Sequence, residues 1–209
     1  EMCIRDSRLL GRLGAGGMGV AFLADGQGQW AVVKVIRSEL ADDPGFRSRV
    51  SRELDAVGRL DGQSARVLAE GLADAVPWFA MEFIEGQTLD HRVRDRGALS
   101  GGALVGFAGE LAVLLAGVHA AGIVHRDVKP SNIMMSPSGP RLIDFGIAEV
   151  DEGTQLTRTG SVMGSLGWLA PEQVRGDATS PATDVHAWAL CVVFAATGQA
   201  PFGSDALSL

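Results

Sequence analysis

Two short segments hold most of the residues that could do chemistry. Residues 124–134 read VHRDVKPSNIM, and residues 142–147 read LIDFGI. Together they bring two carboxylates, a lysine and an asparagine close in sequence among apolar residues. That set meets the needs of phosphoryl transfer, which requires a proton acceptor, positive charge and a metal ion near the phosphates. A plain surface turn would have to account for all of these residue types and their spacing at once.

The roles follow from the side chains. Asp127 can accept the proton of an attacking hydroxyl, and Lys129 can neutralise charge on the phosphoryl group. Asn132 and Asp144 can hold magnesium that bridges nucleotide phosphates. Only two of the 18 basic residues, Lys34 and Lys129, are lysines, and both lie where a compact ammonium suits phosphate oxygens better than a guanidinium does.

A glycine-rich segment lies near the start of the chain. Residues 13–20 read LGAGGMGV, in which Gly14, Gly16 and Gly19 form GxGxxG, a pattern that lets backbone amides approach phosphates. A dinucleotide-binding loop would continue into a helix, whereas here β-prone runs follow over residues 20–23 and 30–36. The sequence therefore favours a strand–loop–strand hairpin over phosphates, with an ordinary glycine-rich turn as the alternative.

The second of these runs contains Ala31-Val32-Val33-Lys34. Alternation along a strand puts Lys34 on the face opposite to Val33, where it can point beneath the glycine loop. Residues 46–60 then have helical spacing of apolar residues, with Glu53 beside the apolar face. Glu53 could pair with Lys34, or it could be a solvated helix carboxylate.

Composition narrows the class of protein. The 209 residues suffice for one large domain or two small lobes, and 46% are hydrophobic, so a sizeable core is expected. A net charge of −7 argues against nucleic acid as a partner.

Cys3 and Cys191 show no metal-ligand spacing, which favours a reducing compartment without structural zinc. The apolar stretch over residues 102–124 contains Glu110 and His119, so we expect a buried helix rather than a membrane span.

Both ends of the sequence look unusual. Residues 1–7 have no initiator methionine at their start, and MCIRDS resembles a translated adapter remnant, so we predict that they are non-native. The last residues, 202–209, follow an apolar helix-like segment without a tail, which suggests an incomplete reading frame.

In these motifs the chain resembles the eukaryotic-like protein kinases, in particular the bacterial serine/threonine kinases of the PknB type. The resemblance runs from about residue 9 to the end. It rests on the glycine loop, the AVVK strand, Glu53, MEFIEGQTL at residues 81–89, HRDVKPSN, DFG, and APE at residues 170–172. It implies an α+β, two-lobed kinase fold: an N-lobe over residues 8–85 with an antiparallel sheet and one helix, and a larger, mainly helical and incomplete C-lobe over residues 86–209.

The resemblance also implies residue roles. Asp127, Lys129, Lys34 and Glu53 are the implied catalytic group, Met81 is the gatekeeper, and the backbones of Glu82 and Ile84 are the hinge that bonds adenine. The implied ATP-binding residues are Leu13, Gly14, Ala15, Gly16, Gly17, Met18, Gly19, Ala21, Ala31, Lys34, Met81, Glu82, Ile84 and Met134. Asn132 and Asp144 are the metal ligands, for magnesium or manganese. Residues with structural roles are His125, Arg126, Phe145, Gly146, Glu172 and Asp184, with Asp184 anchoring the HRD backbone.

The segment between DFG and APE resembles an activation loop, for which an ordinary polar loop is the alternative. Thr157 and Thr159 match the family's phosphosites, Arg126 matches the arginine that grips a phosphorylated loop residue, and Ser165 matches the substrate-loop hydroxyl. The chain has no tyrosine, so tyrosine autophosphorylation is excluded.

The sequence thus indicates an ATP-dependent protein kinase that transfers a phosphoryl group to Ser or Thr hydroxyls, including those of its own loop. A pseudokinase or binding scaffold and a small-molecule phosphotransferase are the alternatives. The resemblance implies a cytoplasmic kinase domain. It allows a homodimer that phosphorylates itself in trans, and it allows a parent protein anchored to a membrane through a downstream segment. It also implies a downstream arginine that pairs with Glu172. Without that arginine we expect Glu172 to lose its buried partner, apolar surface to lie bare beside the Trp188 helix, and the fragment to be poorly stable or inactive.

Overall fold

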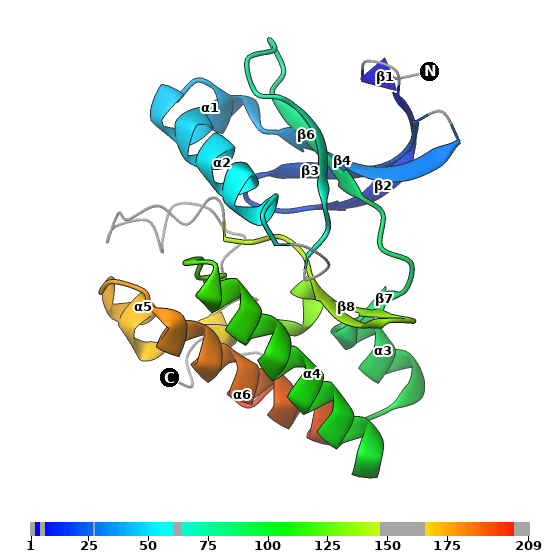
Figure 1. Cartoon of the computed structure of the whole chain (residues 1–209), viewed down its shortest axis with the longest axis vertical. Coiled ribbons are helices and arrows are strands. Elements are labelled where there is room, and N and C mark those ends of the chain that lie inside the picture. The colour runs from blue at the N-terminus through cyan, green and yellow to red at the C-terminus, as the bar shows by residue number, and fades with distance from the viewer. Residues whose placement is uncertain (1–2, 5–6, 27, 61–63, 147–165, 203–209) are drawn as a thin grey trace. The chain divides into compact units, whose positions relative to one another are not determined.

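The computed structural model describes residues 3–4, 7–26, 28–60, 64–146 and 166–202 (Figure 1). The chain divides into two compact units, Glu1–Phe83 and Ile84–Leu209. The boundary was predicted between residues 85 and 86, and here it falls between Phe83 and Ile84. Cys3, Ile4 and Ser7, in the segment predicted to be non-native, take part in strands.

The first unit is built on a six-stranded antiparallel sheet with the order β1-β2-β3-β4-β6-β5. Its strands are β1 (Cys3–Ile4), β2 (Ser7–Ala15), β3 (Gly19–Gly26), β4 (Gln29–Ile36), β5 (Val67–Gly71) and β6 (Trp78–Glu82). One face packs Ala24, Val33, Trp78 and Ala80 into a buried cluster. The predicted hairpin is confirmed, because strand follows strand on both sides of the glycine segment.

Two helices, α1 (Ser38–Ala41) and α2 (Pro44–Val57), follow the β4 strand. The α2 helix begins at a proline, and the Asp43 side chain caps it by accepting from the Gly45 amide at 2.8 Å. Its apolar face is fully buried, as the helical spacing predicted. This face consists of Phe46, Val50, Leu54 and Val57.

The second unit is mainly helical and carries a small three-stranded sheet with the order β7-β8-β9. Its α-helices are α3 (Leu89–Arg96), α4 (Gly101–Ala120), α5 (Pro171–Arg175) and α6 (Pro181–Thr197). Its strands are β7 (Gln87–Thr88), β8 (Ile133–Ser136) and β9 (Gly139–Leu142), and its 3-10 turns are η1 (Pro130–Asn132) and η2 (Leu166–Trp168).

The α4 helix is long and apolar enough to cross a membrane by length and composition alone. It nevertheless packs against α6 and β9 in the core of its unit (Figure 1). Phe107, Leu111 and Val118 are buried, and the Trp188 indole on α6 donates to the Ala108 carbonyl at 3.0 Å. The burial is one-sided, because 28% of this apolar stretch is buried and Val105 and Val113 are 73% and 74% exposed, so the helix is less buried than the sequence predicted.

Another side of α6 carries exposed apolar residues. Val185, Ala189 and Val193, spaced four residues apart, lie on one side of the helix, and Val185 and Val193 are 52% and 45% exposed. Apolar surface is thus exposed on the Trp188 helix itself among the residues that the structure describes, while the loss of a covering segment stays a prediction.

Candidate active site

The glycine segment joins β2 to β3 through a tight turn in which the Gly16 amide donates to the Gly19 carbonyl at 2.9 Å. A Cβ on Gly14, Gly16 or Gly17 would meet nothing within 4 Å, so the space over this loop is open. Gly19 differs, because a Cβ there would lie 2.0 Å from the Val35 carbonyl oxygen. Glycine at this position is therefore required by the close approach of β3 to β4, while the three others leave room for a ligand.

Strand register decides which side chains share a face with Lys34. Lys34 pairs with Ala21 on β3 and with Phe79 on β6, so Ala21 lies on its face as the resemblance implied. Met81 pairs with Val32 and shares that face too. Val33 points to the opposite face and is fully buried there, which confirms the predicted alternation.

The same register corrects the assignment of Ala31 as an adenine contact. Ala31 is three residues from Lys34 and therefore lies on the opposite face of β4, with Val33. Its cross-strand partner is Ala24, a member of the buried cluster on that face. The residue two positions before the lysine, Val32, is the one that shares the face of Lys34.

The other predicted residues of the first unit lie on regular elements or at their ends. Glu53 lies on α2 and is partly buried, and its pairing with Lys34 stays a prediction. The predicted hinge, Met81 to Ile84, spans the boundary between the two units, and both of these residues are buried. Leu13 is exposed and Met18 is buried in the glycine segment.

The catalytic carboxylate predicted from the sequence is held by two neighbours. The Lys129 ammonium donates to Asp127 Oδ2 at 2.8 Å, and Asn132 Nδ2 donates to the same oxygen at 2.9 Å. Both Asp127 and Lys129 are partly buried, with side chains 22% and 20% exposed. Within the described ranges of the chain, no group donates to Asp127 Oδ1. The carboxylate is thus oriented through one oxygen while the other can accept a proton.

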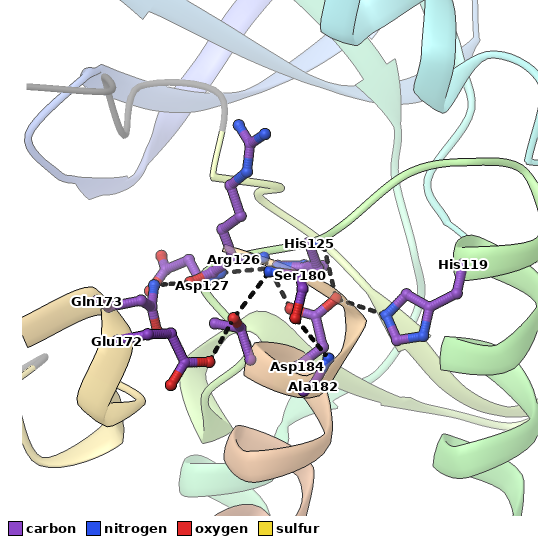
Figure 2. A network of polar contacts seen from close by, with 10 residues as sticks. His119, His125, Arg126, Asp127, Glu172, Gln173, Ser180, Ala182 and Asp184 are labelled. Carbon is purple, nitrogen blue, oxygen red and sulfur yellow. Dashed lines mark hydrogen bonds and ion pairs between the residues drawn. The ribbon is translucent and has the colours of Figure 1, made fainter. Parts of the chain in front are cut away.

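The backbone of His125 and Arg126 is anchored by Asp184, which is 1% exposed near the start of α6 (Figure 2). Asp184 Oδ2 accepts from the His125 amide and Oδ1 accepts from the Arg126 amide, each at 2.8 Å. Arg126 adopts a positive φ of 69°, which costs a non-glycine residue about 1–2 kcal/mol. A buried carboxylate that accepts two amide hydrogens offsets that cost, so the implied role of Asp184 matches the geometry.

A second histidine, which the motifs did not single out, completes the anchor. His119 Nε2 lies 2.8 Å from Asp184 Oδ2, so it can donate to the oxygen that accepts from the His125 amide (Figure 2). It comes from the last turn of α4, six residues before His125. The helical run up to residue 124 placed it on a helix, but only the tertiary structure brings it to Asp184.

The hydrogen bonds of His125 define its protonation. Its Nδ1 accepts from the Asp127 amide at 3.3 Å, and its Nε2 lies 3.2 Å from the Ile143 carbonyl, to which it donates. A ring that accepts at Nδ1 must be neutral there. Burial likewise lowers the pKa of His125 from its usual value, against the opposing charges of Asp184, Asp127 and Asp144.

The DFG segment packs against this loop. Phe145 stacks on the His125 ring with a centroid separation of 4.3 Å, and the Gly146 amide donates to the His125 carbonyl at 2.8 Å. A Cβ on Gly146 would lie 3.0 Å from that carbonyl oxygen and 3.1 Å from Arg126 Cβ, so a side chain there would push the two segments apart. Asp144 has a positive φ of 51°, a strained conformation that is often found at functional sites.

The oxygen donors of this unit fit magnesium bound partly by substrate. Because Asn132 Nδ2 is turned to Asp127, the amide oxygen Oδ1 remains as an acceptor, 3.5 Å from Ser131 Oγ. No group of three His, Cys, Asp or Glu side chains that could hold a metal occurs among the residues that the structure describes. One carboxylate and one amide, completed by phosphate oxygens and water, is a typical magnesium arrangement.

Glu172 of the APE motif has a partner on α6. Its Oε1 accepts from Thr183 Oγ1 at 2.7 Å, and the same hydroxyl accepts from the Ser180 amide at 3.1 Å. The hydrogen bond from Thr183 holds the pKa of Glu172 below its usual value. Glu172 is also partly exposed. Thr183 is thus a hydrogen-bond partner that the sequence did not indicate, and the pairing of Glu172 with a downstream arginine stays a prediction.

Gln173, the residue after that glutamate, connects α5 to the loop that contains Arg126 and Asp127. Its Oε1 accepts from the Ala170 amide at 3.0 Å. Its Nε2 donates to the Arg126 carbonyl at 2.8 Å (Figure 2). The sequence interpretation assigned it no role.

Of the other residues assigned from the sequence, some lie on described elements and some lie outside the described residues. Met134 lies on β8, where it pairs with Thr88 and Arg141. Thr157, Thr159 and Ser165 lie outside the described residues, so their roles stay predictions. Cys191 is a free thiol whose pKa is raised by burial, which makes it unreactive rather than a nucleophile.

Comparison with known proteins defines the class. The protein kinase domain family matches residues 7–208, and the chain therefore belongs to the protein kinase family. The two units are the two-lobed α+β fold of that family, as predicted.

Three of the relatives are bacterial proteins. The chain is 45% identical over 203 residues to the probable serine/threonine-protein kinase PkwA of Thermomonospora curvata, covering 96% of this chain and 27% of that protein. It is 41% identical over 197 residues to the serine/threonine-protein kinase AfsK of Streptomyces griseus, covering 93% and 24%. It is 38% identical over 180 residues to the serine/threonine-protein kinase PknL of Mycobacterium tuberculosis, covering 85% and 45%. The chain spans less than half the length of each of these relatives, and the predicted resemblance to bacterial serine/threonine kinases is confirmed.

Proposed function

We propose that this chain is the catalytic domain of a protein kinase that transfers the γ-phosphoryl group of Mg-ATP to serine and threonine hydroxyls of proteins. The observation that carries the proposal is the arrangement around Asp127. One oxygen of its carboxylate is fixed by Lys129 and Asn132, and its backbone belongs to an anchored loop.

Asp127 acts as the proton acceptor. The hydroxyl oxygen of the substrate forms a bond to the γ-phosphorus, the bond from that phosphorus to the β–γ bridging oxygen breaks, and ADP leaves with the bonding electrons. The hydroxyl proton moves to Asp127. Lys129, already 2.8 Å from this carboxylate, places its positive charge where negative charge develops on the transferred group.

The phosphates require amides and cations on the protein side. The open glycines Gly14, Gly16 and Gly17 leave room for phosphate oxygens to approach backbone amides, and Lys34 supplies an ammonium on the face shared with Ala21. Asn132 and Asp144 would hold the metal. When bound, Mg²⁺ neutralises charge on the phosphates and orients them for in-line transfer.

The relatives' names support a protein substrate, because each is called a serine/threonine-protein kinase. The APE helix and the hydroxyl-rich segment before it support the same substrate class over a small-molecule phosphotransferase. We further propose that Thr157 and Thr159 are autophosphorylated, in trans within a homodimer, and that the domain acts in the cytoplasm, where ATP is available.

A phosphoacceptor screen tests the proposal. The full-length protein is incubated with γ-labelled Mg-ATP and either a serine/threonine peptide array or a panel of small hydroxyl-bearing acceptors. We expect label on the peptides only. Asp127→Asn should reduce the rate by at least about 100-fold, because it removes the proton acceptor and leaves the shape of the side chain unchanged.

The matched control is Asp95→Asn, the same change at an exposed residue of α3, which should leave the rate unchanged. Label on small molecules alone would replace protein kinase activity with small-molecule transfer. ATP binding without transfer to any acceptor would support a binding scaffold instead.

A further inference from the structure

We propose that Gln173 is a positioning residue for catalysis. By donating to the Arg126 carbonyl, it holds the peptide between Arg126 and Asp127 while Arg126 keeps its positive φ. The inference rests on the proposed kinase activity. It arises from a full account of the backbone hydrogen bonds of His125, Arg126 and Asp127.

The three amide groups of this tripeptide all donate within the second unit. The His125 and Arg126 amides donate to the two oxygens of Asp184, each at 2.8 Å, and the Asp127 amide donates to His125 Nδ1 at 3.3 Å. The buried side chains of Asp184 and His125 therefore accept from all three amides of this tripeptide.

The three carbonyl groups accept from three different segments. The Gly146 amide donates to the His125 carbonyl at 2.8 Å, and Asn132 Nδ2 donates to the Asp127 carbonyl at 2.9 Å. The remaining carbonyl, that of Arg126, accepts from Gln173 Nε2 at 2.8 Å. Asp184 and Gln173 both lie outside the sequence motifs, but only Asp184 was assigned an anchoring role from the resemblance, and Gln173 was assigned none.

The position of the Arg126 carbonyl matters because Arg126 has a φ of 69°. A residue in this region relaxes toward negative φ unless both of its flanking peptides are held. Asp184 accepts from the amide of Arg126, and Gln173 donates to its carbonyl. Because that carbonyl belongs to the peptide that enters Asp127, its rotation would turn the catalytic carboxylate away from Lys129 and Asn132.

The partners of Gln173 require an amide side chain at this position. Its Oε1 accepts from the Ala170 amide at the start of α5, and its Nε2 donates to Arg126. Glutamate could accept from Ala170 but could not donate, and methionine could do neither. The two functions, capping of α5 and support of the loop, can therefore be separated by substitution.

The test compares Gln173→Glu with Gln173→Met and with Gln199→Glu in the full-length protein. Gln199 is exposed, so its substitution adds the same charge away from the loop. We expect Gln173→Glu and Gln173→Met each to lower kcat by about 10-fold to 100-fold, the loss that displacement of a catalytic group produces. The KM for ATP should change less than about twofold, because ground-state binding is unaffected. Gln199→Glu should behave as wild type.

Hydrogen exchange of the peptide spanning residues 123–129 gives a readout that does not depend on activity. Both Gln173 variants should exchange faster there, while the α5 peptide of Gln173→Glu, which keeps the cap, should exchange as in wild type. Unchanged kcat in Gln173→Met, or unchanged exchange of the loop, would overturn the proposal. If the wild-type protein transfers no phosphate, the proposed function fails, and the exchange data still decide whether Gln173 holds the loop.

Discussion

The carboxylate of Asp127 depends on side chains that do no chemistry themselves. Lys129 and Asn132 fix one of its oxygens, and Asp184 and Gln173 hold the peptides that precede it. Arg126 keeps its φ of 69° because its amide and its carbonyl are both hydrogen-bonded, to Asp184 and Gln173. The orientation of the proposed proton acceptor thus depends on the surrounding hydrogen bonds.

His125 makes the stability of the second unit depend on pH. Its pKa is lowered in the folded protein from the usual value of 6.5, so the unfolded chain binds more protons just below that pH. The contribution to stability is therefore present above pH 6.5 and is lost as the pH falls below it. The free energy of unfolding should decline with a slope of up to about 1.4 kcal/mol per pH unit for one proton.

Urea unfolding between about pH 5.5 and pH 7.5 measures this slope, since carboxylates titrate mainly at lower pH. The variant His125→Phe, which retains an aromatic ring against Phe145, should lose the slope even if it is less stable throughout. His91→Gln, at an exposed position of α3, should retain it. A wild-type slope equal to that of His125→Phe would show that His125 does not titrate in this way.

At the scale of elements, the Thr183 hydroxyl connects α5 to α6. Thr183 is 1% exposed, and its Oγ1 accepts from the amide of Ser180, the N-cap residue of α6. The same hydroxyl donates to Glu172 on α5. Thr183→Val keeps the shape and removes both hydrogen bonds. We expect the free energy of unfolding to fall by about 1–2 kcal/mol.

Thr183→Ser is the matched control, because it restores the hydroxyl and loses only a methyl group. Chemical denaturation of the three proteins should place the serine variant closer to wild type than the valine variant. Equal stability of wild type and Thr183→Val would mean that the hydroxyl does not join these helices.

The sequence predicted those elements and residues whose signal is local. The β-prone run with Lys34 predicted β4, and the helical spacing of apolar residues predicted α2. The residue types of Asp127, Lys129 and Asn132 indicated the loop proposed to be catalytic. His119, Gln173 and Thr183 escaped prediction because each acts on a backbone group or side chain that only the tertiary structure brings near. Ala31 was assigned wrongly because its distance of three residues from Lys34 puts it on the other face of a strand.

At the scale of the molecule, the machinery is divided between two compact units. The open glycine loop and Lys34 belong to the first unit, and the anchored Asp127 loop and DFG belong to the second. Among the residues that the structure describes, the groups proposed for phosphoryl transfer are therefore shared between the two units. The family assignment over residues 7–208 covers both, which agrees with a catalytic domain that requires the two together.

The most direct test of kinase activity is the intact mass of the full-length protein, with phosphopeptide mapping, before and after incubation with Mg-ATP, beside an Asp127→Asn control. We predict that the wild type gains phosphoryl groups on Thr157 or Thr159 and that the variant gains none. A wild-type protein that binds Mg-ATP and phosphorylates neither itself nor any serine or threonine peptide would contradict the assignment of protein kinase activity.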